Sequence, residues 1–181
     1  MDICKYFLAL VLPEPLQNQV MSLKQFVKDH YESKAALRSP AHITLHMPFE
    51  WKSKKEKLLL DTLRHFKFGR PVHINLQNFN CFEPRVVYVD VIPSPELHDL
   101  QKALVMHVKQ NLGLMNEAEN ARGFHPHVTI AFRDLNKEKF RQAWEHFKTQ
   151  KFEGHFTTSN FQLLKHSPGK WEVFQDFTFD A

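Results

Sequence analysis

The chain has 181 residues, of which 43% are hydrophobic, and it contains 17 Phe but only 5 Gly. This length and composition suit one domain, or two small lobes packed closely, with enough apolar material for a core. The formal net charge of +4 gives a mild preference for an anionic ligand. No stretch approaches the roughly 20 apolar residues that span a bilayer, and the N-terminus lacks the organisation of a signal peptide.

The composition also argues against several kinds of site. Cys4 and Cys81 are too few for a disulfide framework or for the common zinc-site spacings. Neither a GxGxxG loop nor a P-loop occurs in the sequence. We therefore expect a cytoplasmic monomer in a reducing compartment, with no membrane partner, no metal and no cofactor.

The first half of the chain alternates strand-like and helical patterns. An apolar run over residues 6–12 predicts a strand, and apolar residues spaced three and four apart predict a helix from Leu16 to about His30. A β-branched segment at 42–45 predicts the next strand. It is followed by a helix over Lys54–Phe66 and a strand over Val72–Phe82.

The second half repeats this order, and Pro-x-Pro follows the first strand of each half. Its expected elements are strands over Val86–Ile92, 127–130, Phe152–Leu164 and Trp171–Phe179, and helices over Glu96–Leu112 and Asn136–Phe147. Each half therefore reads β-α-β-α-β-β, with Val86–Ile92 shared between them. We predict an α+β fold with two lobes, approximately residues 1–85 and 86–181, around a central groove. Exchange of strands between the lobes is left open.

Two short segments read almost alike and occupy matching places in the repeat. His42–Leu45 reads His-Ile-Thr-Leu, and His127–Ile130 reads His-Val-Thr-Ile. Because side chains alternate along a strand, the histidine and threonine of each tetrad share one face. A two-fold relation between the lobes would bring these faces together. Two imidazoles facing one phosphodiester can supply a general base and a general acid, and threonine hydroxyls can bind the phosphate oxygens.

The paired tetrads resemble those of the two-histidine (2H) phosphoesterase superfamily, in particular its branch of 2′-5′ RNA ligases and RNA 2′,3′-cyclic phosphodiesterases. The second copy is the closer match, because Phe124–Ile130 is similar to the family's Phe-x-Pro-His-x-Thr-Leu segment. The resemblance implies two antiparallel-rich sheets facing a groove. It also implies metal-independent chemistry, without a cofactor, on RNA ends or small nucleotides that carry a 2′,3′-cyclic phosphate or a 2′-5′ linkage.

The resemblance assigns the catalytic role to both histidines and both threonines of the tetrads, His42, Thr44, His127 and Thr129. For hydrolysis of a cyclic phosphate it favours His127 as the general base and His42 as the general acid. In the ligation direction these roles exchange.

Seven further side chains are candidates for contacting the phosphate, ribose or base, because cationic groups bind phosphate and aromatic rings stack on bases. They are Tyr6, His46, Arg85, Arg122, Phe124, His125 and Arg133. His46 follows His42 by four residues, so strict alternation puts both on one face. Tyr6 and Tyr88 occupy matching repeat positions. Many relatives carry a basic residue where this chain has Phe132, and alternation turns the neighbouring Arg133 to the other face unless a bulge intervenes.

Two other functions remain open from the sequence. The chain could be an RNA- or nucleotide-binding module without turnover, although the intact tetrads favour an enzyme. It could also be a cyclic phosphodiesterase for a nucleotide other than RNA, such as a cyclic phosphate derived from ADP-ribose. An open, basic groove would favour oligonucleotides, whereas a closed pocket would favour a mononucleotide.

Overall fold

The computed structural model describes residues 2–116 and 123–179. The strands are β1 (Ile3–Val11), β2 (His42–Lys52), β3 (Val72–Phe82), β4 (Val86–Val91), β5 (His127–Ala131), β6 (Glu153–Thr158), β7 (Asn160–Ser167) and β8 (Lys170–Thr178). The helices are α1 (Leu16–Tyr31), α2 (Glu56–Arg64), α3 (Pro95–Leu112) and α5 (Lys137–Phe147), with short 3-10 segments η1 (Ala35–Arg38) and η2 (Ser53–Lys55).

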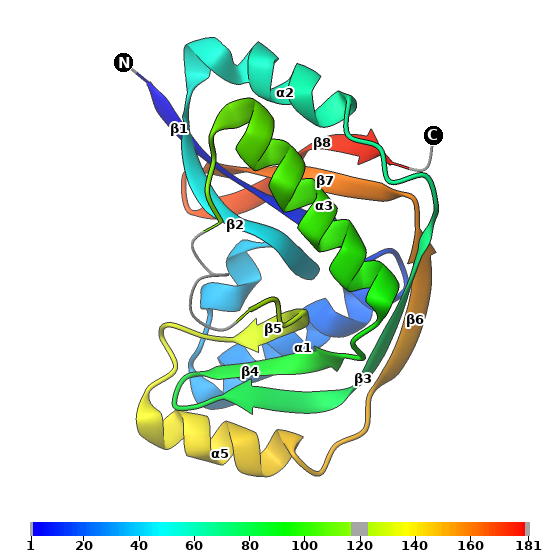
Figure 1. The fold of residues 1–181 in the computed structure, drawn as a ribbon. Helices are drawn as coiled ribbons and strands as arrows, with labels where there is room; N and C mark the ends of the chain where they lie inside the picture. Colours follow the sequence, from blue (N-terminus) through cyan, green and yellow to red (C-terminus); the bar gives the residue numbers. More distant parts are fainter. Residues whose placement is uncertain (1, 117–122, 180–181) are drawn as a thin grey trace.

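The strands form two four-stranded sheets (Figure 1). Sheet A has the order β2-β1-β7-β8, and sheet B has the order β5-β4-β3-β6. All six neighbouring pairs are antiparallel. The predicted α+β fold with two antiparallel sheets is therefore confirmed. Each sheet contains strands from both halves of the chain, because β7 and β8 join β1 and β2, and β6 joins β3.

The segment Phe152–Leu164, predicted as one strand, is divided between the two sheets. β6 ends at Thr158 and pairs with β3, whereas β7 begins at Asn160 and pairs with β1. At the break, the Thr158 hydroxyl bonds the carbonyl of Asn160 and also accepts its N–H. Before the break the even-numbered residues 152–158 are partly buried, whereas after it the odd-numbered residues 161 and 163 are buried. A shift of one residue exchanges the faces of a strand, and this shift of parity is the signal that separates the two strands.

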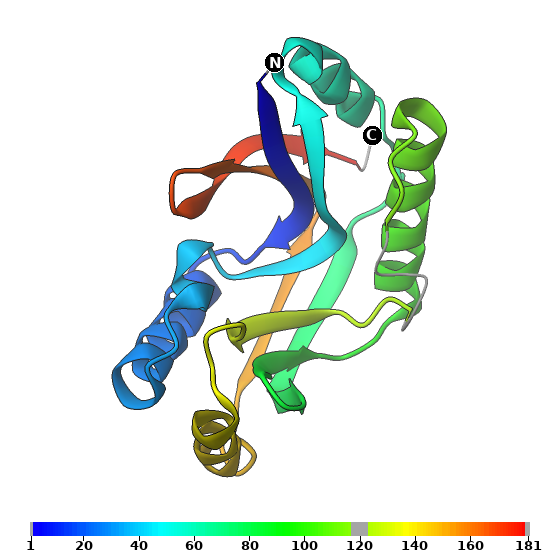
Figure 2. The same cartoon turned by 90° about the vertical axis from the view of Figure 1, so that its left-hand side faces the viewer.

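The helices bury the apolar stripes that their spacing predicts. α1 buries Leu16, Val20 and Val27 and packs against β5 and α5. α3 packs against β2 and β3, and it begins where the Ser94 hydroxyl accepts the N–H of Leu97. In Figure 2, α1 and α5 lie on one side of the molecule and α2 and α3 on the other. The core between them is contiguous across both sheets.

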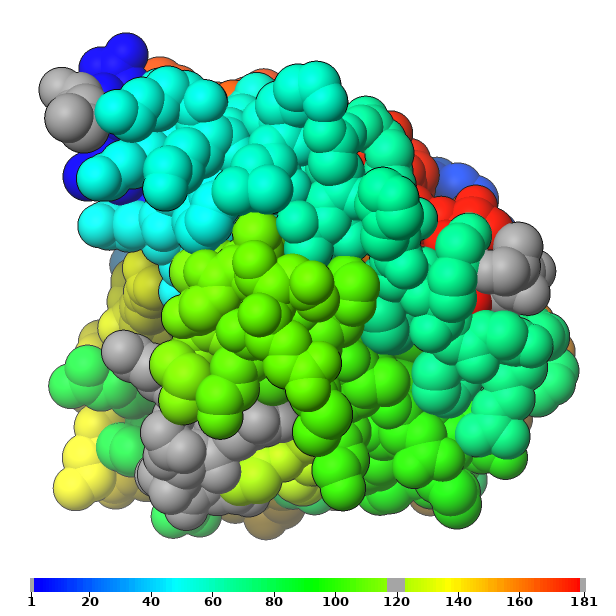
Figure 3. All heavy atoms as spheres, turned by 45° about the horizontal axis from the view of Figure 1, so that its top comes forward, coloured from blue at the N-terminus to red at the C-terminus, as the bar shows by residue number. Residues whose placement is uncertain are grey.

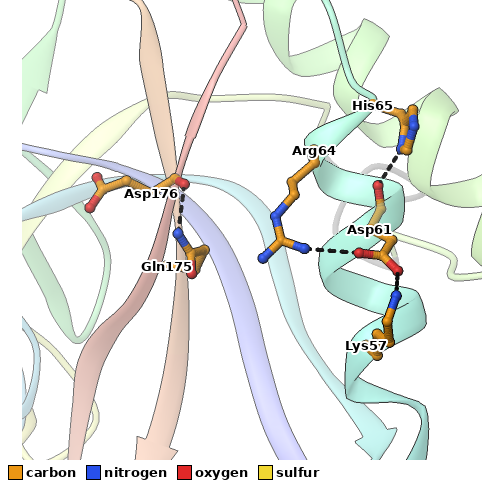
Figure 4. Close-up of polar contacts among 6 residues, drawn as sticks. All are labelled: Lys57, Asp61, Arg64, His65, Gln175 and Asp176. Atoms are coloured by element: carbon orange, nitrogen blue, oxygen red, sulfur yellow. Dashed lines mark hydrogen bonds and ion pairs between the residues drawn. The ribbon is translucent and has the colours of Figure 1, made fainter.

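α2 lies beside α3, and both helices form part of the surface shown in Figure 3. Its buried side chains are Leu59 and Leu63. On its outer surface, the Asp61 carboxylate accepts hydrogen bonds from Lys57 and Arg64 (Figure 4). Exposed pairs of this kind contribute only a few tenths of a kcal/mol to stability. The position of α2 therefore depends on its two leucines and on its hydrogen bonds to other elements, which Glu56 accepts from Tyr6 and Lys165 and the Thr62 carbonyl accepts from His107.

The two sheets meet at the edge strands β2 and β5, which lie against each other. Asp134, just after β5, ties this junction to the segment that leads into β2. Its Oδ1 accepts the Ser33 hydroxyl at 2.7 Å. Its Oδ2 accepts the backbone N–H groups of Lys34 at 2.9 Å and Ala35 at 3.0 Å. These bonds join segments about 100 residues apart in the chain, and they set the position of β2 relative to β5.

We expect Asp134→Ala to lower the free energy of unfolding by about 2 kcal/mol, because hydrogen bonds to a charged acceptor are worth more than neutral ones. Denaturant unfolding measures this change. Asp99→Ala is the matched control, because Asp99 only pairs with Arg70 at 3.3 Å on the exposed surface and should change stability by less than about 1 kcal/mol. Equal losses in the two variants would show that Asp134 does not tie the sheets together.

Candidate active site

The two tetrads show the alternation that their sequence predicts. The histidine and threonine of each are half-buried, whereas the apolar residues are fully buried in the core. These apolar residues are Ile43, Leu45, Val128 and Ile130. We call the side of the two sheets that carries His42, Thr44, His127 and Thr129 the histidine face.

Both motif histidines are held in the same way. His42 Nδ1 donates to the carbonyl of Pro40 at 2.7 Å, and His127 Nδ1 donates to the carbonyl of His125 at 2.7 Å. A carbonyl oxygen only accepts, so the proton is placed on Nδ1 and the neutral ring keeps its lone pair on Nε2. The same bond fixes the direction of each ring. Each imidazole therefore has Nε2 available for proton transfer.

The electrostatic surroundings of the two histidines differ. The pKa of His42 is lowered to about 4, chiefly by burial and also by the charges of Lys24 and His127, against the opposing effect of the Pro40 carbonyl. Burial also lowers the pKa of His127. There the carbonyl of His125 and the charge of Asp90 act in the opposite direction. The effect of His127 on His42 shows that the two imidazoles interact.

Cross-strand register places different neighbours beside the two histidines. Residues directly opposite each other in an antiparallel pair share one face. Val11 lies opposite His42, whereas Asp90 lies opposite His127. The site therefore has an apolar neighbour on one side and a carboxylate on the other.

The threonines also have unlike neighbours. Ala9 lies opposite Thr44, and Tyr88 lies opposite Thr129. Ala9 therefore occupies the repeat position equivalent to Tyr88, and the predicted match between Tyr6 and Tyr88 is wrong. Tyr6 is fully buried on the other face of β1, where its hydroxyl donates to Glu56.

Aromatic side chains flank each histidine. Phe7 lies 4.9 Å from the His42 ring and contacts Trp171 edge-on at 4.8 Å. Phe82 lies 5.1 Å from the His127 ring, and Tyr88 lies 4.9 Å from it. These are distances between ring centroids. Trp171 and Phe82 are only partly buried, so each leaves ring surface exposed for contact with a ligand.

His46 lies on the core side of β2, away from the histidine face. It pairs with Leu8, whereas Thr44 pairs with the next residue, Ala9. One extra residue in β2 therefore forms a bulge, and a bulge re-aims the side chains beyond it. His46 is 1% exposed, and its Nδ1 bonds the Met47 carbonyl. Strict alternation from His42 did not allow for this bulge.

The other five residues that were predicted to contact the ligand lie in different surroundings. His125 is exposed beside the motif histidine, where its Nε2 shares a hydrogen bond with the Tyr88 hydroxyl at 3.2 Å. Phe124 is partly buried against the core and contacts His98. Arg85 is exposed in the turn between β3 and β4. Arg133 lies beyond the end of β5 with a φ of 58°, and its guanidinium stacks on Phe132. Arg122 lies outside the described residues.

A buried lysine next to the site was missed by the sequence analysis. Lys24 is 1% exposed, and its ammonium donates to the carbonyl of Ser39 at 3.0 Å. It lies four residues after Val20 and three before Val27, within the buried stripe of α1. The sequence signal for the burial of Lys24 is its position within the apolar stripe of the helix.

Val11, the cross-strand neighbour of His42, lines a cavity of about 340 Å³. Its polar lining residues are Thr157, Thr158, Asn160, Gln162 and Asp176. Among the described residues that line it, none is a lysine, arginine or histidine. The lining offers hydroxyl, amide and carboxylate groups, so it suits an uncharged polar group better than a phosphate.

Within residues 2–116 and 123–179, no group of three or more His, Cys, Asp or Glu side chains is placed to hold a metal ion. No helix in these two ranges is long and apolar enough to cross a membrane.

Comparison with known proteins gives a consistent result. Residues 12–170 match the model of the 2′-5′ RNA ligase superfamily. A protein of Geobacillus sp. (strain WCH70) that carries the name Putative phosphoesterase is 28% identical over 177 residues, which cover 96% of this chain and 95% of that one.

Solved structures share the fold across the whole chain. Escherichia coli LigT in complex with 3′-AMP superposes with a TM-score of 0.71 at 19% identity, covering 99% of this chain and 100% of LigT. TT0787 of Thermus thermophilus superposes with a TM-score of 0.69 at 18% identity, covering 98% of each chain.

The low pKa of His42 predicts a pH dependence of stability. The folded state favours the neutral ring, so the stabilisation is complete above the unfolded pKa of about 6.5 and is lost as the pH falls toward about 4. This loss is on the order of 3 kcal/mol. We expect thermal unfolding of His42→Gln to change less between pH 7 and pH 4.5 than that of the wild type. If the stability of the two proteins changed equally between these pH values, the lowered pKa of His42 would be contradicted.

Proposed function

The chain belongs to the 2′-5′ RNA ligase superfamily, and we propose that it is a metal-independent phosphodiesterase. Its proposed substrates are RNA ends or nucleotides that carry a 2′,3′-cyclic phosphate or a 2′-5′ phosphodiester bond, with 2′-5′ ligation as the reverse reaction. The observation that carries this proposal is the matched pair of histidines, each with Nδ1 bound to a carbonyl and Nε2 available.

Hydrolysis of a cyclic phosphate uses both histidines at once. A neutral Nε2 takes a proton from water as the water oxygen bonds to phosphorus. The bond between phosphorus and one ribose oxygen breaks, and that oxygen receives a proton from the other, protonated Nε2. The product is a phosphomonoester, and the two rings have exchanged protonation states, which solvent restores. Each acid or base group is worth about 10²–10⁴-fold in rate.

The threonine hydroxyls complete the site. Thr44 and Thr129 each lie two residues from a motif histidine on the same strand face. A hydroxyl can donate to a non-bridging phosphate oxygen, which gains negative charge in the transition state. We therefore assign Thr44 and Thr129 to stabilisation of the phosphate.

The unlike surroundings of the histidines suggest how a nucleotide would be oriented. The cavity beside Val11 contains polar groups for a ribose or base, and Trp171 next to Phe7 offers a ring for stacking. Complex formation between LigT and 3′-AMP supports a nucleotide ligand for this fold. One chain supplies both tetrads, so we propose that the monomer is active.

Replacement of either histidine tests the mechanism. We expect His42→Ala and His127→Ala each to lower kcat/KM for 2′,3′-cyclic nucleotides by about 10²–10⁴-fold, because each removes one proton-transfer group. The assay contains EDTA, and His73→Ala is the control, since His73 on β3 only bonds Thr157 on the exposed surface. Wild-type turnover that requires added metal, or full activity in either motif variant, would refute the proposal.

Replacement of the threonine hydroxyls tests phosphate stabilisation. We expect Thr44→Val and Thr129→Val each to lower kcat by about 10²–10³-fold, as loss of one donor to a developing oxyanion does. Steady-state kinetics measures the change. Thr149→Val removes an exposed hydroxyl after α5 and should leave kcat unchanged. If the motif variants alter only KM, the hydroxyls bind the substrate and transition state equally, and their catalytic role is excluded.

A further inference from the structure

Lys24 lies directly behind the segment that holds His42. Its Nζ donates to the carbonyl of Ser39, and the next residue, Pro40, supplies the carbonyl that holds Nδ1 of His42. The side chain is 1% exposed. Among the ion pairs of the described residues, none includes Lys24.

This arrangement is costly for the fold. An ammonium group removed from water without a carboxylate partner is destabilising, and an apolar side chain of similar size would fill the same space at lower free energy. Burial accordingly lowers the pKa of Lys24 to about 7. A buried charge retained beside a reactive group indicates a role in function more than in stability.

The equivalent position in the second half of the repeat does not carry a lysine. α1 buries residues 16, 20, 24 and 27, and among the residues that α3 buries, 97, 101, 105 and 108 have the same spacing. Val105 therefore occupies the position equivalent to Lys24. Beside the histidines the difference is reversed, because Asp90 near His127 corresponds to Val11 near His42. The symmetric scaffold thus has a cation on one side and an anion on the other.

We propose that Lys24 is a positioning residue for the reaction: its ammonium behind the segment that holds His42, and the Asp90 carboxylate opposite His127, give the two rings unlike roles, with His42 as the general base and His127 as the general acid. This assignment rests on the proposed phosphodiesterase function. It is opposite to the roles that the family resemblance favours. His42 Nε2 takes the proton of the attacking water, and His127 Nε2 gives its proton to the departing ribose oxygen.

Among residues 2–116 and 123–179, the charged and titratable groups that act on each ring are few. His42 faces Lys24 from α1 and His127 from β5. His127 faces Asp90 from β4 and His125 from the segment before β5. Of these groups, only Lys24 and Asp90 act in opposite directions on the two rings. The effect of replacing Lys24 can therefore be measured on His42, and the effect of replacing Asp90 can be measured on His127.

NMR titration of the imidazole resonances, without substrate, tests the charge effect directly. In the wild type, His42 should lose its proton at lower pH than His127. Lys24→Met should raise the midpoint of His42 by roughly one unit, because a like charge is removed. Asp90→Asn should lower the midpoint of His127. An unmoved His42 in Lys24→Met, or a wild-type His127 that titrates below His42, would overturn the proposal.

The fold should tolerate the substitution, because Met replaces a buried charge with an apolar chain of similar length. Lys24→Arg retains the charge, so it serves as the second variant and should leave the midpoint of His42 close to that of the wild type. A shift equal to that of Lys24→Met would show that the effect comes from altered packing and not from charge.

A substrate with a nitrophenolate leaving group tests the roles, since this group departs without a proton from the enzyme. On a nitrophenyl ester of a nucleotide, His127→Ala should remain within about tenfold of the wild type, and His42→Ala should lose activity by at least about 10²-fold. Any other pattern overturns the assignment. A wild type inactive on all cyclic nucleotides would refute the proposed function, but the NMR titration would still decide the effect of Lys24.

Discussion

The contact between the edge strands β2 and β5 is the constraint on which the site depends. Each strand carries one of the two tetrads, so neither sheet alone contains both motif histidines. The contact is tied by Asp134, which bonds the segment before β2 from its place after β5. Because the edges of the two sheets lie against each other, the duplicated halves each contribute one tetrad to the same junction.

Much of this architecture follows from local sequence patterns. Apolar residues at spacings of three and four located all four described helices, and period-two alternation predicted which residues of the tetrads lie in the core. The carbonyl that holds each histidine lies only two residues upstream, so this geometry is local as well. The pairing of the two tetrads across the sheets followed from the repeat and not from either motif alone.

The failures occurred where side-chain direction depends on register. A bulge in β2 places His46 on the core side, and cross-strand pairing aligns Tyr88 with Ala9 where the sequence comparison had chosen Tyr6. The change of sheet at Ser159 divides a segment that reads as one strand. Lys24 was visible as a lysine within an apolar stripe. Its proximity to His42 depends on how α1 packs, which one helix does not reveal.

A crystal structure with a nucleoside 2′-monophosphate, the expected product of hydrolysis when the 3′-oxygen leaves, tests the central claim most directly. We expect the phosphate to lie between Nε2 of His42 and Nε2 of His127. Its non-bridging oxygens should accept hydrogen bonds from the hydroxyls of Thr44 and Thr129. A phosphate that binds elsewhere, such as in the cavity beside Val11, or that contacts only one of the histidines, would contradict the account.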